Sequence, residues 1–334
     1  MTAPEFADLL DEMFDRPVDE GITLAFVAQQ HGEVVAERYG TQPENIFEPV
    51  RKITADSTLT SWSMAKSITH AVVGLLVGDG LLDVEAPASV PEWAGTPKAE
   101  ITLLQLLEMR SGLRFVEDYV DDGVSQCLEM LFGESGPSHA AYAAALPLDH
   151  PPGSVYNYSS GTTNIIARII GDVVAGGPGG DPSERRARTE AFLQNRLFGP
   201  AGMASAIPKF DGAGDFVGSS YVYATARDFA RFGELYRHDG RTTAGEQILP
   251  VGWTDHARGF SARDPENGCD YGRHWWMWPQ LPGSVVCHGH EGQYVIVDPG
   301  RELVMVHLGK TPSGSTARLR ARLGSLVHAF PRFG

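Results

Sequence analysis

The chain has 334 residues, which is enough to bury a substantial core in one large domain or two smaller ones. Its net charge of −15 argues against unspecific binding to nucleic acid or to an anionic membrane surface. The three cysteines lack Cys-x-x-Cys spacing, which indicates reduced, structural thiols. Without a signal-type N-terminus or an apolar run of about 20 residues, we expect a soluble, cytoplasmic protein.

The first 80 residues are expected to contain two helices and a hairpin. Residues 4–14 form an amphipathic helical pattern, and the strand-like runs 22–29 and 33–39 are separated by a His31-Gly32 turn. A polar stretch containing Ser63 and Lys66 is followed by an apolar run, which Gly78-Asp79-Gly80 ends. This pattern predicts a helix of about four turns that begins at Ser63.

The sequence pattern changes in the middle of the chain, where short helical patterns are separated by loops rich in glycine and proline. The helices are expected at residues 102–109, 124–132, 139–145, 162–174 and 184–197. The glycine-rich loop 176–180 lacks the spacing of a dinucleotide site, so it is interpreted as a surface turn.

Strand patterns return after residue 218. Strands are expected at 219–223, 274–278, 285–288, 293–298 and 303–308, with helices at 226–237 and 315–328. This order predicts an α+β fold in which both chain ends build one antiparallel sheet flanked by N- and C-terminal helices. The sheet domain would comprise residues 1–80 and 210–334, residues 81–209 would form an inserted helical lobe, and the active site would lie between them.

Ser63 and Lys66 are the first candidate catalytic pair. Residues three apart share a helical face, so the amine would lie beside the hydroxyl. A serine needs a base to become a nucleophile, and lysine serves only when burial or a nearby cation lowers its pKa. A helix N-terminus would further favour an alkoxide. The alternative is a capping serine beside an exposed lysine.

The second candidate stretch is Pro152–Gly161, which contains Tyr156 and Tyr158. Its serines suit a loop that caps the following helix. A phenol held beside a cationic lysine would be more acidic than free tyrosine and could transfer protons. The stretch itself does not discriminate between the two tyrosines.

The third candidate stretch is 288–294, which opens a strand. His288 and His290 could form part of a metal site, although no third ligand can be placed. A glycine-rich strand start could instead leave backbone N–H groups free to hold an oxyanion. The chain has no Gly-x-Ser-x-Gly elbow, His-Glu-x-x-His motif or phosphate-binding loop.

Together the three stretches resemble the serine hydrolases of the penicillin-recognising, β-lactamase/transpeptidase-like fold. The family pattern is Ser-x-x-Lys, then Tyr-x-Asn or Tyr-x-Ser, then Lys-Thr-Gly or His-x-Gly. Here Ser63–Lys66, Tyr158–Ser160 and His290–Gly292 are similar to it, in the same order. Flanking segments such as 80–83, 101–113 and 198–203 extend the resemblance, which is strongest to the nylon-oligomer (aminohexanoate-dimer) hydrolases and family VIII esterases.

The resemblance implies catalytic roles for particular residues. Ser63 would be the acyl-accepting nucleophile, Lys66 the general base and Tyr158 the residue that passes a proton to the leaving group. The backbone N–H groups of Ser63 and Gln293 would form the oxyanion hole. No cofactor and no metal are expected.

Ser160, His290 and Gly292 are the substrate-binding residues that the resemblance implies. Ser160 replaces the asparagine of many β-lactamases, and His290 replaces a lysine that holds a substrate carboxylate. A neutral imidazole holds a carboxylate more weakly than a fixed cation does. Hydrolysis of simple esters or linear amides is therefore expected rather than efficient β-lactam turnover.

Two other classes of function remain open at this stage. One is a fold relative without turnover that binds a ligand or acts as a scaffold. The other is a metallohydrolase built on His288 and His290. The sequence does not indicate the natural substrate or the oligomeric state. Aromatic residues that could line an acyl pocket, or pack in the core, are Phe260, Tyr271, Trp275, Trp276 and Trp278.

Overall fold

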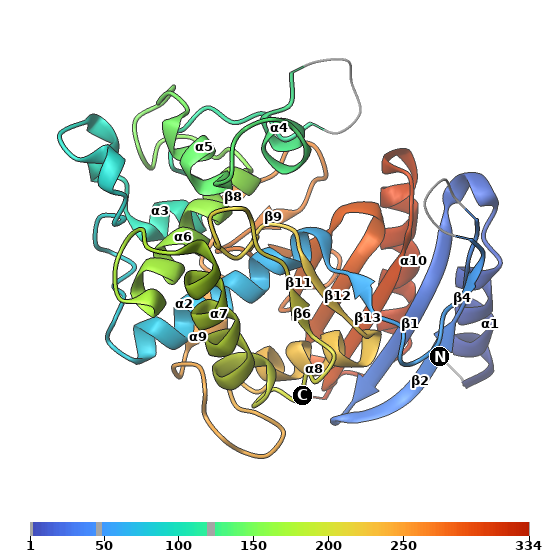
Figure 1. Cartoon of the computed structure of the whole chain (residues 1–334). Helices are drawn as coiled ribbons and strands as arrows, with labels where there is room; N and C mark the ends of the chain where they lie inside the picture. The colour runs from blue at the N-terminus through green and yellow to red at the C-terminus, as the bar shows by residue number, and fades with distance from the viewer. Residues whose placement is uncertain (1–2, 45–48, 119–123, 334) are drawn as a thin grey trace.

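The structure is a computed structural model that describes residues 3–44, 49–118 and 124–333. Figure 1 shows a sheet built from both ends of the chain beside a mainly helical half made from its middle. In the described residues, no helix is long and apolar enough to cross a membrane. The α-helices are α1 (Ala3–Phe14), α2 (Ala65–Gly78), α3 (Leu103–Leu107), α4 (Gln126–Phe132), α5 (His139–Ala145), α6 (Ser160–Ala175), α7 (Pro182–Leu193), α8 (Ala226–Arg237), α9 (Trp253–Ala257) and α10 (Thr316–His328).

The main sheet has eight strands in the order β2-β1-β13-β12-β11-β10-β9-β8, and all neighbouring pairs are antiparallel. Its strands are β1 (Ile22–Gln30), β2 (Glu33–Tyr39), β8 (Ala262–Arg263), β9 (Asp270–Tyr271), β10 (Trp276–Met277), β11 (Val285–Gly289), β12 (Gln293–Asp298) and β13 (Leu303–Lys310). Strand β1 from the N-terminal end pairs with β13 from the C-terminal end, with Val27 opposite Val306. The predicted antiparallel sheet built from both chain ends is therefore confirmed.

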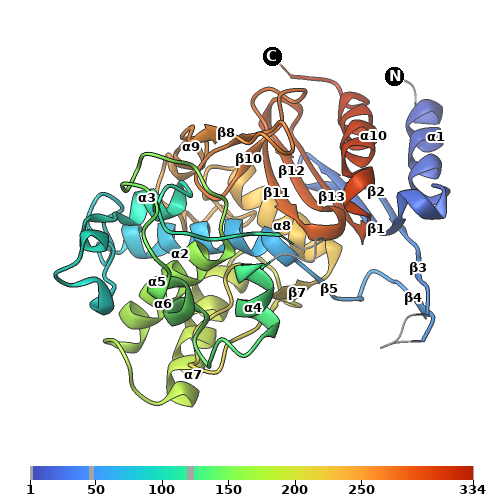
Figure 2. The same cartoon turned by 90° about the horizontal axis from the view of Figure 1, so that it is seen from above.

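Both faces of the central strands are covered, which explains their nearly continuous burial. Helices α1 and α10 lie side by side on one face, as Figure 2 shows, and Met13 and Leu323 pack there against Phe26. Helix α8 covers the other face. Its Gly233 makes this approach possible, because a Cβ atom there would lie 2.5 Å from Val304.

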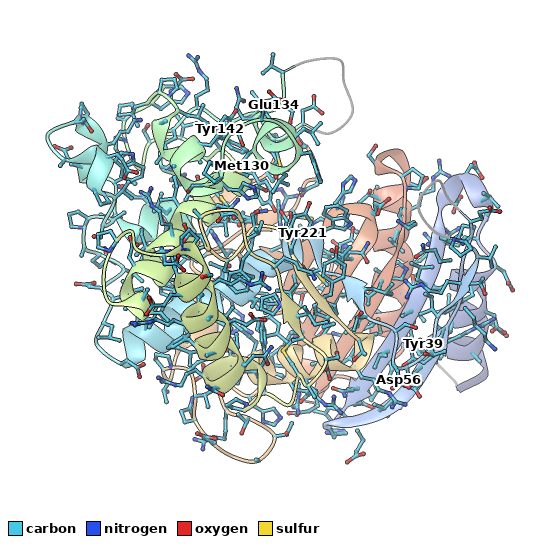
Figure 3. All side chains as sticks on the ribbon, viewed as in Figure 1. Tyr39, Asp56, Met130, Glu134, Tyr142 and Tyr221 are labelled. Atoms are coloured by element: carbon cyan, nitrogen blue, oxygen red, sulfur yellow. The ribbon has the colours of Figure 1, made fainter. Side chains whose placement is uncertain are left out.

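The helical half surrounds α2. This helix is apolar on nearly all sides and is buried from Ala65 to Leu76, as expected for a helix with neighbours all round. Helix α6 packs against it. Figure 3 shows Met130 of α4 and Tyr142 of α5 in this half, Tyr39 of β2 at the far side of the sheet, and Tyr221 between them.

One apolar cluster runs through both halves and includes Val72 of α2, Ile166 of α6 and Val306 of β13. The α+β architecture with an antiparallel sheet and flanking terminal helices is confirmed. The division at residues 80 and 210 stays a prediction.

Two predicted strands are much shorter than expected. Of residues 219–223, only the end belongs to a strand, because Ser219 and Ser220 form a buried turn. Of residues 274–278, only β10 is a strand, because His274 has a φ of 60° in the left-handed region. The strand end at 222–223 is part of β7 (Val222–Ala224). The other short strands outside the main sheet were not predicted, namely β3 (Thr41–Gln42), β4 (Arg51–Lys52), β5 (Leu59–Thr60) and β6 (Ile207–Pro208).

Candidate active site

Ser63 lies in a 3₁₀ turn, Trp62–Met64, that leads directly into α2. The turn is held against β7 by Ser61, whose backbone N–H donates to the Val222 carbonyl (2.8 Å) and whose hydroxyl accepts from the Val222 N–H (3.0 Å). Trp62 has a φ of 42°, a left-handed conformation that is costly for a large side chain and often marks functional sites. The turn presents a half-buried Ser63 at the N-terminal end of α2.

Lys66 is buried one helical turn further on, at 2% exposure. Its Nζ lies 3.0 Å from the Ser63 Oγ, 2.9 Å from the Ser160 Oγ and 3.1 Å from the Ser219 carbonyl oxygen. Burial lowers the pKa of Lys66 below its ordinary value, and the carboxylate of Glu117 partly opposes this effect. The alternative of an exposed lysine is therefore wrong.

Tyr158 lies beside this pair, with the Lys66 Nζ 4.8 Å from the centre of its ring. Burial raises the pKa of Tyr158 well above its ordinary value, and hydrogen bonding with the Ser63 side chain opposes this only in part. The expectation of an unusually acidic phenol is wrong, because desolvation of the phenolate outweighs a neighbouring amine. Tyr158 therefore stays protonated and able to donate. Tyr156 instead donates to Asp264 (3.3 Å).

The third predicted stretch, residues 288–294, lies at the end of β11 and approaches the turn that carries the nucleophile. Strand β11 ends at Gly289, where a Cβ atom would lie 2.4 Å from the Ser61 carbonyl oxygen, so only glycine allows this approach. A 3₁₀ turn, His290–Gly292, connects it to β12. Gln293 opens β12, and its buried side chain bonds both backbone groups of Gly309 (2.7 and 3.0 Å). The oxyanion-hole role of Gln293 stays a prediction.

His288 and His290 make separate contacts. The His288 Nε2 is hydrogen-bonded to the Tyr294 hydroxyl (2.9 Å), and the His290 ring stands edge-on to Trp62. Burial lowers the pKa of His288 to about 3 and also lowers the pKa of His290. Among the residues that the structure describes, no group of three or more His, Cys, Asp or Glu side chains could hold a metal ion.

A pocket of about 630 Å³ opens over Ser63. Of the predicted site residues, Tyr158, His290 and Gly292 also line it, whereas Lys66, Ser160 and Gln293 lie behind its wall. Trp276 is the one predicted aromatic residue among the lining residues. The other candidates are in the core or on the surface: Tyr271, Trp275 and Trp278 are buried, and Phe260 is 65% exposed.

The wall of this pocket is acidic. Among the described lining residues, Arg320 is the only lysine or arginine, and the carboxylates are Glu117, Asp118, Asp264, Glu266 and Glu291. Partial desolvation lowers the pKa of His290 below its ordinary value, Lys310 adds to this shift, and Glu291 opposes it. The position expected to bind a substrate carboxylate therefore has no fixed charge.

Sequence reasoning did not identify three residues of the site. Ser219 supplies a carbonyl oxygen to Lys66, Glu117 contacts Ser160 with both carboxylate oxygens, and Trp62 carries the strained backbone before the nucleophile. None of them belongs to one of the three motif stretches that resemble the family pattern. Only the proximity of Trp62 to Ser63 could have drawn attention to it.

Comparison with known proteins extends over nearly the whole chain. The model of the Beta-lactamase family matches residues 10–329. The chain is 27% identical over 322 residues to a 6-aminohexanoate-dimer hydrolase of Paenarthrobacter ureafaciens, covering 90% of this chain and 76% of that protein.

Solved structures share the fold. A Bacillus anthracis protein, provisionally assigned as a 6-aminohexanoate-dimer hydrolase, superposes with a TM-score of 0.74 at 24% identity, covering 97% of this chain and 83% of the other. A family VIII carboxylesterase superposes with a TM-score of 0.69 at 17% identity, covering 98% of each chain.

Proposed function

Because the chain belongs to the beta-lactamase family, we propose that it is a serine hydrolase that cleaves an ester or amide bond through an acyl-enzyme on Ser63. The observation that carries this proposal is the buried Lys66 amine, 3.0 Å from the Ser63 Oγ at the base of a pocket. That distance lies within hydrogen-bond reach of a nucleophile and its base. The named relatives, a dimer hydrolase and a carboxylesterase, agree with this reaction class.

In acylation, neutral Lys66 accepts the proton of Ser63 as the Oγ bonds to the substrate carbonyl carbon. The carbonyl oxygen becomes an oxyanion, which accepts hydrogen bonds from the backbone N–H groups of Ser63 and Gln293. Such a donor typically contributes about 3 kcal/mol. Tyr158 donates its proton to the leaving oxygen or nitrogen as the tetrahedral intermediate collapses and regains one from Lys66. Water then attacks the acyl-enzyme, and the same groups transfer its proton back to Ser63.

We expect a fluorophosphonate probe to label the wild-type protein at Ser63 and to leave Ser63→Ala unlabelled. The probe adds its phosphonyl group only to an activated nucleophile. Intact-mass spectrometry after brief exposure measures the adduct, and Ser325→Ala, which removes an exposed hydroxyl on α10, serves as the control. Equal labelling of wild type and Ser63→Ala would overturn the proposal. Absent labelling and turnover in wild type would favour a non-catalytic scaffold.

We further expect cationic substrates to be preferred over anionic ones of the same length. The acidic wall attracts an ammonium group and repels a carboxylate, as does the overall charge of −15. The measurement compares kcat/KM for two aryl esters, one ending in an ammonium group and one in a carboxylate. The preference should weaken as salt is raised, because salt screens these charges. A carboxylate preference that persists in high salt would contradict this expectation.

A further inference from the structure

Glu117 and Ser160 make a two-point contact beside the lysine. One carboxylate oxygen of Glu117 accepts from the Ser160 backbone N–H (2.7 Å), and the other accepts from the Ser160 hydroxyl (2.5 Å). A carboxylate can only accept, so the single proton of the Ser160 hydroxyl is directed at Glu117. Ser160 Oγ must therefore act as an acceptor toward Lys66, which lies 2.9 Å away.

Hydrogen bonds and ring packing fix the position of the segment that carries Glu117. The side-chain amide of Asn157 donates to the carbonyls of Leu113 (3.4 Å) and Phe115 (3.0 Å). Gly161, in the first turn of α6, allows the Phe115 ring to pack there, because a Cβ atom at this position would lie 2.5 Å from that ring. The contact between Glu117 and Ser160 is therefore held by the loop that also carries Tyr158.

The other contacts of Lys66 show how the donors and the lone pair of its neutral amine are used. The Ser219 carbonyl oxygen, like the Ser160 Oγ, can only accept from Lys66. A neutral amine has two N–H donors and one lone pair. With both donors used by these fixed acceptors, the lone pair is left facing Ser63 Oγ at 3.0 Å.

We propose that Glu117 is a positioning residue, which acts through Ser160 to turn the lone pair of Lys66 toward Ser63. This inference rests on the proposed function, because it concerns the same nucleophile and base. Glu117 does not itself take the serine proton. Its carboxylate instead sets the direction of one hydrogen bond, and that direction decides whether the amine can act as a base.

The substitution Glu117→Gln tests the direction of that bond while preserving size. The Ser160 N–H can only donate, so it binds the new amide oxygen, and the amide NH₂ group then faces Ser160 Oγ and donates to it. The hydroxyl proton of Ser160 must turn toward Lys66, where it occupies the lone pair. We expect acylation by a neutral aryl ester to slow on the order of 10–100-fold, with a normal melting temperature.

Ser160→Ala provides the decisive background, because it removes the hydroxyl through which Glu117 would act. In that background, Glu117→Gln should have no further effect on the acylation rate measured on the pH plateau, where Lys66 is neutral, so the plateau rate of the double variant should match that of Ser160→Ala. If Glu117 acted through its charge or through the fold, the substitution would slow acylation equally in both backgrounds. Equal effects in the two backgrounds would overturn the inference.

The pH profile gives a readout that a merely structural role would not change. The carboxylate of Glu117 raises the pKa of Lys66 against the effect of burial. Glu117→Gln should therefore move the acidic limb of kcat/KM to lower pH while reducing its plateau. Asp118→Asn removes a charge from the same pocket wall, one residue on, and serves as the matched control for loss of a pocket carboxylate.

The two proposals fail in different ways. Probe labelling that persists in Ser63→Ala defeats the proposed function itself. Labelling confined to Ser63, together with a wild-type acylation rate and pH profile in Glu117→Gln, defeats only the positioning role of Glu117.

Discussion

Replacing Lys66 by alanine should slow acylation of Ser63 by several powers of ten. The amine is the only basic group that the structure places within hydrogen-bond reach of Ser63 Oγ among the described residues, at 3.0 Å. A positioned general base typically contributes 10²–10⁴-fold, and members of a catalytic unit lose activity together when one is removed. Stopped-flow measurement of the first turnover with a chromogenic ester reports the acylation step directly.

Two further variants control for the lost volume of the Lys66 side chain and for the loss of a lysine outside the site. Lys66→Met retains most of the side-chain volume in the buried site but has no amine, so it should be as slow as Lys66→Ala. Lys52→Ala removes an exposed lysine on β4 and should retain the wild-type rate. Small primary amines added to Lys66→Ala should restore part of the rate. An acylation rate within tenfold of wild type in both Lys66 variants would rule out the amine as the base.

The sequence allowed accurate prediction where local signals mark the ends of an element. Helices α5 and α8 and strand β12 occupy the predicted ranges: the cap residues Ser138 and Thr225 precede the two helices, and Gly292 and Pro299 flank the strand. The nucleophile helix begins as a 3₁₀ turn and becomes α-helical at Ala65, a difference confined to its first turn. Short strands such as β5 have no periodicity of their own and depend on their partner, here β7.

The site was only partly predictable for a related reason. The Ser-x-x-Lys spacing places Ser63 and Lys66 together within one helix, so local geometry is sufficient. The contact of Glu117 with Ser160 depends on how the loop 113–118 packs against α6, which no local pattern specifies. The sign of the pKa shift of Tyr158 likewise depends on burial, which outweighs its neighbours.

Acidification should destabilise the fold well before most carboxylates titrate. Five histidines that are withdrawn from water are responsible: His256, whose pKa burial lowers to about 4, together with His70, His274, His288 and His307. Burial lowers the pKa of the last three to about 3 and that of His70 well below its ordinary value. Nearby cations lower these pKa values further: Lys66 acts on His274, Arg320 on His288, Arg16 on His307 and Arg273 on His70.

The sign follows from proton linkage. Between about pH 6.5 and pH 4, the unfolded chain binds protons on these rings and the folded chain does not, so the free energy of unfolding falls as pH falls. At pH 5 a ring whose pKa falls from about 6.5 to between about 3 and 4 contributes about 2 kcal/mol of destabilisation, and several such rings together approach the total stability of many domains. Asp215 acts in the opposite direction, because burial raises its pKa to about 6, but it is one group against five.

Calorimetry at pH 5 in buffers of different ionisation enthalpy should therefore show a net uptake of about four protons on unfolding, together with a melting temperature far below that at pH 7.5. His70→Gln should reduce the uptake by about one proton, because Gln does not titrate at this buried position between α2 and α8. The matched control, His31→Gln, changes an exposed ring in the β1–β2 turn and should leave the uptake unchanged. A melting temperature independent of pH between 7.5 and 5 would mean that these rings are protonated in the folded protein, and that their burial is relieved by water or by a carboxylate partner.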